Sequence, residues 1–127
     1  MGMNTVMKKR ILSASRIMSK PLRIDSPVRF KFVKMDARYT GYPSFKYMVE
    51  VISLHKAPKI KAFNEIRDWC IETWGMSVER EQYLYMEDMD PEGIKLNPAW
   101  CWHTEDHKMN IYLRDEAEKM WTELRWK

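Results

Sequence analysis

The sequence has few cysteines, no glycine-rich segment and no long run of apolar residues. Its two cysteines, Cys70 and Cys101, are too few for the disulfide framework of a small secreted domain, so we expect buried thiols in a reducing compartment. Without a glycine-rich segment, the chain has no phosphate-binding loop of the nucleotide-binding kind. No apolar run approaches the ~20 residues needed to cross a bilayer, and the N-terminus lacks an apolar signal-peptide core. We therefore predict a cytoplasmic protein without a membrane partner.

The apolar material is sufficient for one folded core. Among 127 residues, 45% are hydrophobic and 13% are aromatic. A chain of this length buries roughly two thirds of its unfolded surface and needs neither disulfides nor metal to fold. Pro21 and Pro27 interrupt the beginning of the chain and favour extended structure. We therefore divide the chain into a basic N-terminal arm, residues 1 to 27, and one domain, residues 28 to 127.

Positive charge is concentrated at the start of the chain. Residues 1 to 46 contain eleven Lys or Arg and two acidic residues, whereas the remainder contains eleven basic and sixteen acidic residues. Such a basic region attracts polyanions, so nucleic acid is the predicted partner and an acidic protein surface is the alternative. The arm also has the composition of an organelle transit peptide, which is a second interpretation of the same residues. The cations that we assign to polyanion binding are Lys8, Lys9, Arg10, Arg16, Lys20, Arg23, Arg29, Lys31 and Lys34.

The first half of the domain contains two strand patterns and one helix pattern. Residues 28 to 34 alternate between apolar and basic side chains, which predicts a strand with one wet or ligand-facing side. Residues 45 to 54 are apolar on both faces and predict a central strand. Residues 59 to 74 form the clearest helix, and Gly75 ends it. The apolar stripe of this helix consists of Ile60, Phe63, Ile66, Cys70 and Trp74.

The second half of the domain ends in a hairpin and a helix. Residues 83 to 86 are interpreted as a short strand, followed by an acidic turn. Residues 99 to 113 predict a hairpin through the turn TEDHK. The last helix, residues 115 to 126, begins with a capping box formed by Asp115 and Glu118. Its predicted core stripe consists of Ala117, Trp121 and Leu124, with Met120 beside it.

The order of these elements predicts an α+β fold. Strand 45 to 54, helix 59 to 74, hairpin 99 to 113 and helix 115 to 126 follow the ferredoxin-like β-α-β-β-α plan without its last strand. The strand at residues 28 to 34 fills the vacant place. Right-handed crossovers then put both helices on one face of an antiparallel sheet and leave the other face open.

The stretch CWHTEDH holds a cysteine, two histidines and two carboxylates within seven residues. A zinc site needs four ligands in tetrahedral arrangement, and the candidates here are Cys70, Cys101, His103 and His107. Cys101 and His103 point to one side of the predicted strand, and a site requires that side to face the helices. We predict no bound metal, no cofactor and no catalytic residue, and we keep a metal-dependent site at His103 and His107 as an alternative.

Aromatic residues on the predicted strands have two interpretations. Trp100 and Trp102 alternate on one side of their strand, where burial in the core is favoured because it removes a large apolar area from water. The alternative is a stacking platform for the bases of single-stranded nucleic acid on the open face. Phe30 and Trp102 are the residues that we assign to this stacking role.

The segments RDWCIETWG and IYLRDEAEKMWTELRW resemble small ferredoxin-like proteins encoded by tailed bacteriophages, over about residues 63 to 126. In those proteins, a W-C-x(3)-W/F-G helix end is followed by a tryptophan strand and a terminal hairpin and helix. The resemblance implies a viral accessory or virion protein that acts by binding, in the host cytoplasm or in the virion. We therefore predict a non-catalytic protein that contacts nucleic acid through its basic region. The alternative is a protein–protein interaction module, which is an inhibitor of a host factor or a self-associating virion subunit.

Overall fold

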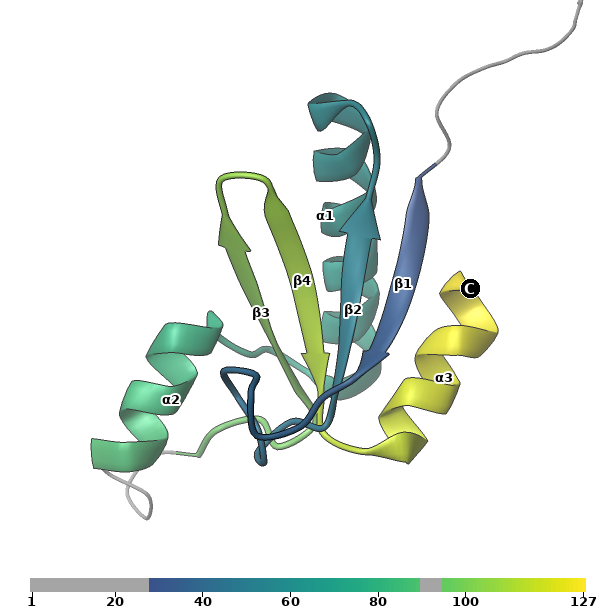
Figure 1. Ribbon diagram of the computed structural model, residues 1–127. Helices are drawn as coiled ribbons and strands as arrows, with labels where there is room; N and C mark the ends of the chain where they lie inside the picture. Colours follow the sequence, from purple (N-terminus) through teal and green to yellow (C-terminus); the bar gives the residue numbers. More distant parts are fainter. Residues whose placement is uncertain (1–27, 90–94) are drawn as a thin grey trace, which may run out of the picture.

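A four-stranded antiparallel sheet and three helices make up the part of the chain that the structure describes (Figure 1). The computed structural model describes residues 28–89 and 95–127; the predicted arm and most of the predicted acidic turn lie outside these ranges. The strands are β1 (Arg29–Lys34), β2 (Tyr47–Ile52), β3 (Trp100–Glu105) and β4 (Lys108–Leu113). The helices are α1 (Lys56–Trp74), α2 (Arg80–Met89) and α3 (Glu116–Trp126). The predicted α+β class is confirmed.

The sheet has the order β1-β2-β4-β3, with every neighbouring pair antiparallel. β3 and β4 form the predicted hairpin, whose turn includes Asp106 at a positive φ of 36°. β1 and β3 are the two edges. Lys31 pairs with Glu50, Glu50 with Asn110, and Asn110 with His103, so these four residues form one row across all four strands. Because side chains alternate along a strand, the register fixes which residues share a face.

One face of the sheet is covered by α1, which lies behind the strands in Figure 1. Phe63, Ile66 and Cys70 are buried there against Val49 and Trp100. Ile60 of the predicted stripe is exposed instead. Gly75 ends the helix at a positive φ of 95°, as predicted, and its carbonyl accepts a hydrogen bond from the indole of Trp100.

Helix α3 packs on the same face as α1, beside β1 (Figure 1). The ring of its Trp126 lies 5.4 Å from Phe30 and 6.4 Å from Trp69 of α1. The predicted capping box is present, because Asp115 caps the first turn and Glu118 accepts from the Asp115 amide. The predicted core stripe of α3 is wrong: Ala117, Met120, Trp121 and Leu124 are all exposed.

Polar residues occupy the buried side of α3 in place of that stripe. Glu118 and Thr122 are buried, one helical turn apart. Arg114 donates to the Glu118 carboxylate at 2.9 Å, and the Thr122 hydroxyl donates to the Glu118 carbonyl at 2.8 Å. These bonds satisfy the polar groups that burial removes from water, so the helix is turned by about half a turn from the orientation that its apolar residues predict.

Helix α2 covers one end of the other face of the sheet, where the sequence predicted a short strand over residues 83 to 86. That prediction is wrong, because Tyr83 and its neighbours are helical. The ring of Tyr83 lies 4.9 Å from Phe45 in an edge-on contact, and its hydroxyl donates to the Asn97 carbonyl. Burial raises the pKa of Tyr83 to about 12. The start of α2 is fixed at the edge of β3, because Glu79 forms a parallel bridge with Trp102.

Candidate functional site

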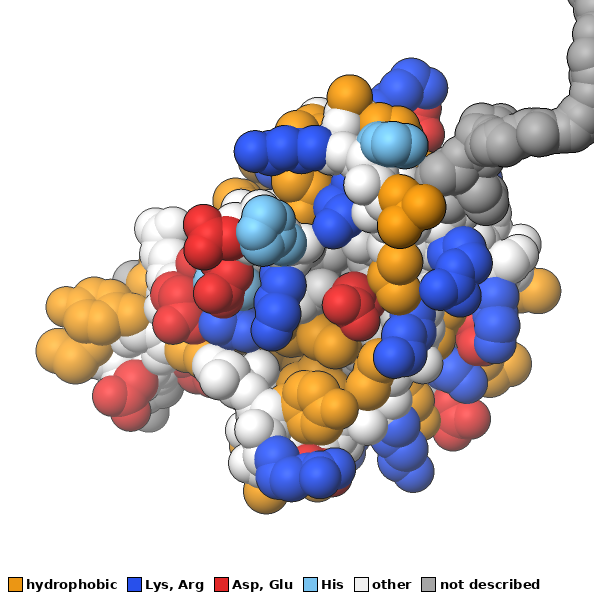
Figure 2. Space-filling view, turned by 45° about the horizontal axis from the view of Figure 1, so that its top comes forward, with side chains coloured by type: hydrophobic (Ala, Val, Ile, Leu, Met, Phe, Trp, Pro, Cys, Tyr) orange, Lys and Arg blue, Asp and Glu red, His pale blue; other side chains and the backbone are white. Residues whose placement is uncertain are grey.

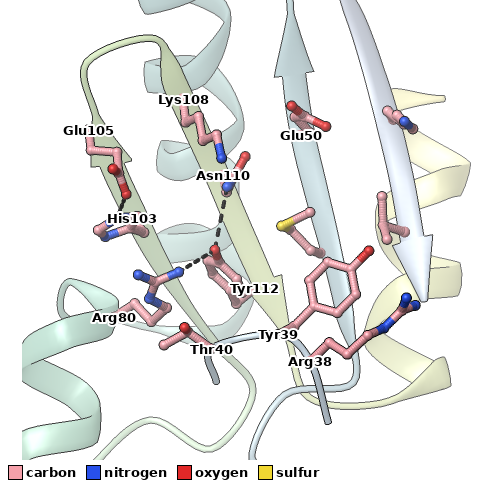
Figure 3. Close-up of a pocket in the computed structure, with 13 residues that line it drawn as sticks. Arg38, Tyr39, Thr40, Glu50, Arg80, His103, Glu105, Lys108, Asn110 and Tyr112 are labelled. Carbon is pink, nitrogen blue, oxygen red and sulfur yellow. Dashed lines mark hydrogen bonds and ion pairs between the residues drawn. The ribbon is translucent and has the colours of Figure 1, made fainter. Parts of the chain in front are cut away.

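The face of the sheet opposite α1, here called the open face, contains a hollow of about 410 Å³ (Figure 3). Its floor is formed by sheet residues that include Asn110 and Tyr112, and Arg80 of α2 closes one side. The loop between β1 and β2 forms another part of the wall. The lining residues are Lys31, Val33, Arg38, Tyr39, Thr40, Met48, Glu50, Arg80, His103, Glu105, Lys108, Asn110 and Tyr112.

Arg80 connects α2 to the floor of the hollow. Its guanidinium donates to the Tyr112 hydroxyl at 2.8 Å and to the Glu81 carboxylate at 3.0 Å. Burial opposes the charge of Arg80, but the influence of Tyr112 and Glu81 outweighs it and raises the pKa of the guanidinium above its usual value. A cation is therefore held in place beside the hollow rather than left to move in solvent.

Asn110 has a polar atom with no hydrogen-bond partner among the described residues. It lies in the middle of the hollow and is only 5% exposed. Its amide nitrogen donates to the Tyr112 hydroxyl at 3.4 Å, while Oδ1 is buried without a partner. If the amide were turned over, Oδ1 would accept the free proton of Tyr112 and the nitrogen would be left instead. In either orientation one group of this buried amide has no partner among the described residues, which costs about 1 to 3 kcal/mol.

His103 stands between two carboxylates at the β3 side of the hollow. Its Nδ1 contacts Glu79, and its Nε2 lies 2.7 Å from Glu105. Both ring nitrogens of His103 are therefore engaged by carboxylate oxygens. The hydrogen bond from His103 lowers the pKa of Glu105. His103 therefore connects the start of α2 to β3.

The rim of the hollow carries both signs of charge. Figure 2 shows carboxylates grouped beside a histidine on this side of the molecule, with Lys and Arg side chains spread across the face. Arg38 is paired with Asp36 at 2.9 Å. Lys31 and Lys108 lie on β1 and β4, and neither forms an ion pair with another described residue. These two lysines are therefore the rim cations that an anionic ligand can reach without breaking an ion pair among the described residues.

Three of the predicted cations lie within the described residues. Lys31 lines the hollow, and Arg29 points to the same open face. Lys34 is the last residue of β1. It is exposed, and its position in the alternation places it on the other face from Lys31. The six others, Lys8, Lys9, Arg10, Arg16, Lys20 and Arg23, lie outside the described residues.

Apart from Lys31 and His103, which was a candidate metal ligand, sequence reasoning did not single out the residues of the hollow. The segment KMNIYL alternates and places Lys108, Asn110 and Tyr112 on one face of β4. That signal was available in the sequence. The position of Arg80 was not, because it depends on where α2 packs.

The predicted stacking residues both lie on the helix-covered face. Phe30 packs against Trp126, and the ring of Trp102 lies 6.4 Å from Phe63 and 5.2 Å from the Arg67 guanidinium. Trp100 is fully buried on that face as well. The core interpretation of the tryptophans is therefore confirmed, and Phe30 and Trp102 are not placed to stack bases on the open face.

The four candidate zinc ligands do not come together. Cys70 of α1 is buried in the core between this helix and the sheet, whereas Cys101 is buried on the opposite face of the sheet with Tyr83 and Tyr112. His103 is held by two glutamates, and His107 is exposed in the hairpin turn. Within residues 28–89 and 95–127, no group of three or more His, Cys, Asp or Glu is placed to hold a metal ion. A metal site built from His103 and His107 with the two cysteines is contradicted by these positions.

Burial raises the pKa of both thiols, so the two cysteines are inert, as the sequence predicts for buried ones.

No family model, no curated protein and no solved structure matches the chain. Among the described helices, none combines the length and apolarity required to cross a membrane.

Proposed function

We propose that the protein is a non-catalytic binding protein that holds single-stranded nucleic acid against the open face of its sheet. The observation that carries this proposal is the row of Lys31, Glu50 and Asn110 across the hollow, with Lys108 beside it. Lys31 and Asn110 are two strand spacings apart, or about 10 Å. A ligand that spans the row must therefore offer a negative charge at one end and hydrogen-bonding groups at the other.

The chemistry of the row fits a nucleotide strand better than a plain polyanion. Lys31 and Lys108 suit phosphate oxygens. Glu50 repels phosphate but accepts hydrogen bonds from the amino groups of bases, and the Asn110 amide recognises base edges in the same way. Tyr39, half-buried in the wall, offers a ring on which a base can stack. Unpaired bases present all of these groups, whereas a duplex hides its base edges from a flat sheet.

The N-terminal arm extends this proposal. Six of its residues are basic, and we propose that they contact phosphates on either side of the segment bound in the hollow.

The cytoplasmic location and the kinship with small phage proteins stay predictions. We also infer that the plan is ferredoxin-like: β2, α1, β3, β4 and α3 follow β-α-β-β-α, and β1 takes the place of the fourth strand.

The test measures binding of a labelled single-stranded oligonucleotide to the full chain by fluorescence anisotropy over a range of salt. Lys31→Gln combined with Lys108→Gln should weaken binding about tenfold and reduce the salt slope by about 1.4, or 0.7 per lost phosphate contact on a single strand. The matched control combines Lys56→Gln with Lys61→Gln, which removes the same charge from α1. Equal affinity of the two double variants, or no binding by the wild type at low salt, contradicts the proposal.

A second candidate function is a protein–protein interaction module. The specific observation in its favour is the exposed apolar side of α3, which has no role in the hollow. That surface is the basis of the inference that follows.

A further inference from the structure

Helix α3 presents an apolar face to solvent. Met120, Trp121 and Leu124 are 54%, 61% and 82% exposed, and Ala117 one turn earlier is exposed too. Their spacing of three and four residues places them on one side of the helix, here called the α3 stripe. The buried residues of α3 lie on the opposite side. Single exposed apolar residues are common, but a stripe along a helix indicates a surface that another molecule covers.

We infer that the α3 stripe is the contact surface for a second copy of this chain, with the two α3 helices antiparallel around a two-fold axis. The axis passes between Met120 and Trp121. Each of these residues then lies beside its own counterpart, and Ala117 of one copy faces Leu124 of the other. The stripe is therefore self-complementary. The small Ala117 meets Leu124 at each end, and the large side chains of Met120 and Trp121 meet at the centre.

The charges at the two ends of α3 favour this orientation. The helix begins with Asp115 and Glu116 and ends with Arg125 and Lys127. In the antiparallel pair, Glu116 of one copy lies on the same flank of the interface as Lys127 of the second, whose ammonium lies 3.3 Å from Glu123 of its own chain. Glu116 has no ion pair with another described residue, so it is available for this contact. A parallel pair would instead place the two acidic first turns side by side, where they repel.

The edges of the sheet are less suited to self-association than α3. Strand β1 is an edge strand, but its exposed positions include Arg29, Lys31 and Lys34. Charged side chains of this kind discourage pairing between edges. The contact through α3 also leaves the open face of both copies free, because α3 lies on the other side of the sheet. The inference therefore does not depend on the proposed binding of nucleic acid.

The size of the stripe sets the expected affinity. One helix face buries less than the ~800 Å² per partner of a standard interface, so we expect a weak dimer whose population depends on protein concentration. Sedimentation velocity of the full chain from about 1 to 200 µM should show a monomer converting to a dimer. Leu124→Glu should weaken the dimer more than tenfold, because it puts a charge into the centre line of the contact. Leu54→Glu is the matched control, since Leu54 is 88% exposed but lies outside α3.

A symmetric cross-link tests the geometry of the pair. Met120→Cys places two thiols beside the axis, close enough for a disulfide between copies. The native thiols are buried and do not compete. Met76→Cys, at another exposed methionine, is the control. Mild oxidation should give a covalent dimer of Met120→Cys at least tenfold faster than of Met76→Cys.

The outcomes decide between the occupants of the stripe. A dimer that Leu124→Glu dissociates and Leu54→Glu does not, together with fast cross-linking at position 120, supports the inference. A chain that stays monomeric throughout the range overturns it, and the stripe is then covered by residues 1–27 of the same chain or by another protein. A dimer that Leu124→Glu leaves intact also overturns it, because the contact then lies elsewhere.

Discussion

The guanidinium of Arg80 donates to the hydroxyl of Tyr112 at 2.8 Å and stands 5.3 Å from the centre of its ring. This contact joins the first turn of α2 to the C-terminal end of β4. It also decides which polar groups remain available in the hollow, because Tyr112 accepts from Arg80 and from Asn110 at once. The candidate site therefore depends on the packing of a helix against the sheet, and substitutions at this contact are expected to change both stability and binding.

Tyr112→Phe removes the hydroxyl and keeps the ring in the core. Arg80 and Asn110 then lose their shared acceptor, so we expect the free energy of unfolding to fall by about 1 to 2 kcal/mol. Urea denaturation followed by circular dichroism measures this change. Tyr85→Phe is the control, because Tyr85 is exposed on α2, the helix that carries Arg80. We expect its free energy of unfolding to change by less than about 0.5 kcal/mol. Equal stability of the two variants would show that the Arg80 contact contributes nothing to holding α2 in place.

His103→Gln tests the connection between the start of α2 and β3. Glutamine has one amide in place of two ring nitrogens, so it cannot hold Glu79 and Glu105 together, and one buried contact is lost. We expect a loss of about 1 to 3 kcal/mol in the free energy of unfolding. His107→Gln changes the same residue type at an exposed turn and should change stability by less than about 0.5 kcal/mol.

A double-mutant cycle separates the energy of the His103–Glu79 contact from the other effects of each substitution. Glu79→Gln, His103→Gln and the double variant give the coupling energy between the two residues. Residues in direct contact inside one network usually couple by about 0.5 to 3 kcal/mol. Additive effects of the two substitutions would show that the His103–Glu79 contact has no energetic role.

Local patterns predicted the sheet well because its side chains follow simple rules. The alternation in β1 and the apolar run of β2 placed both strands within two residues of their observed ends. The capping box of α3 was also readable, since Asp115 and Glu118 act within a single turn. The orientation of α3 was not readable. It depends on Arg114 and Thr122 satisfying Glu118 in a buried place, which apolar periodicity cannot indicate.

Some residues of the candidate site could likewise be predicted from the sequence, and others could not. Lys31 was predicted from its strand, and the alternation of β4 held the information for Lys108 and Asn110. The role of Arg80 required knowing that residues 80 to 89 are helical and that they pack over Tyr112. The residues YLYM suit a strand as well as a helix, and tertiary contacts of Tyr83 with Phe45 decide between them.

The two buried thiols predict a loss of stability in alkaline solution. Burial raises the pKa of Cys70 and of Cys101, whereas unfolding returns each thiol to about 8.5. Below that value both states keep their protons, so the thiols cause no change in stability. Above it the unfolded chain ionises while the folded chain does not, so stability falls with rising pH by up to about 1.4 kcal/mol per pH unit and thiol. We expect the free energy of unfolding to be about 2 to 3 kcal/mol lower at pH 9.5 than at pH 7.

The measurement is urea denaturation in the presence of a reductant at several pH values between these two. The control is the variant with Cys70→Ala and Cys101→Ala, which is less stable at pH 7 because of the small cavities but has no thiol to ionise. Its stability should change little over the same range, since Tyr83, with its pKa of about 12 in the folded chain, affects stability only near and above pH 10. If both proteins lose stability in parallel, the alkaline sensitivity comes from other groups, and the thiols reach solvent more easily than their burial indicates.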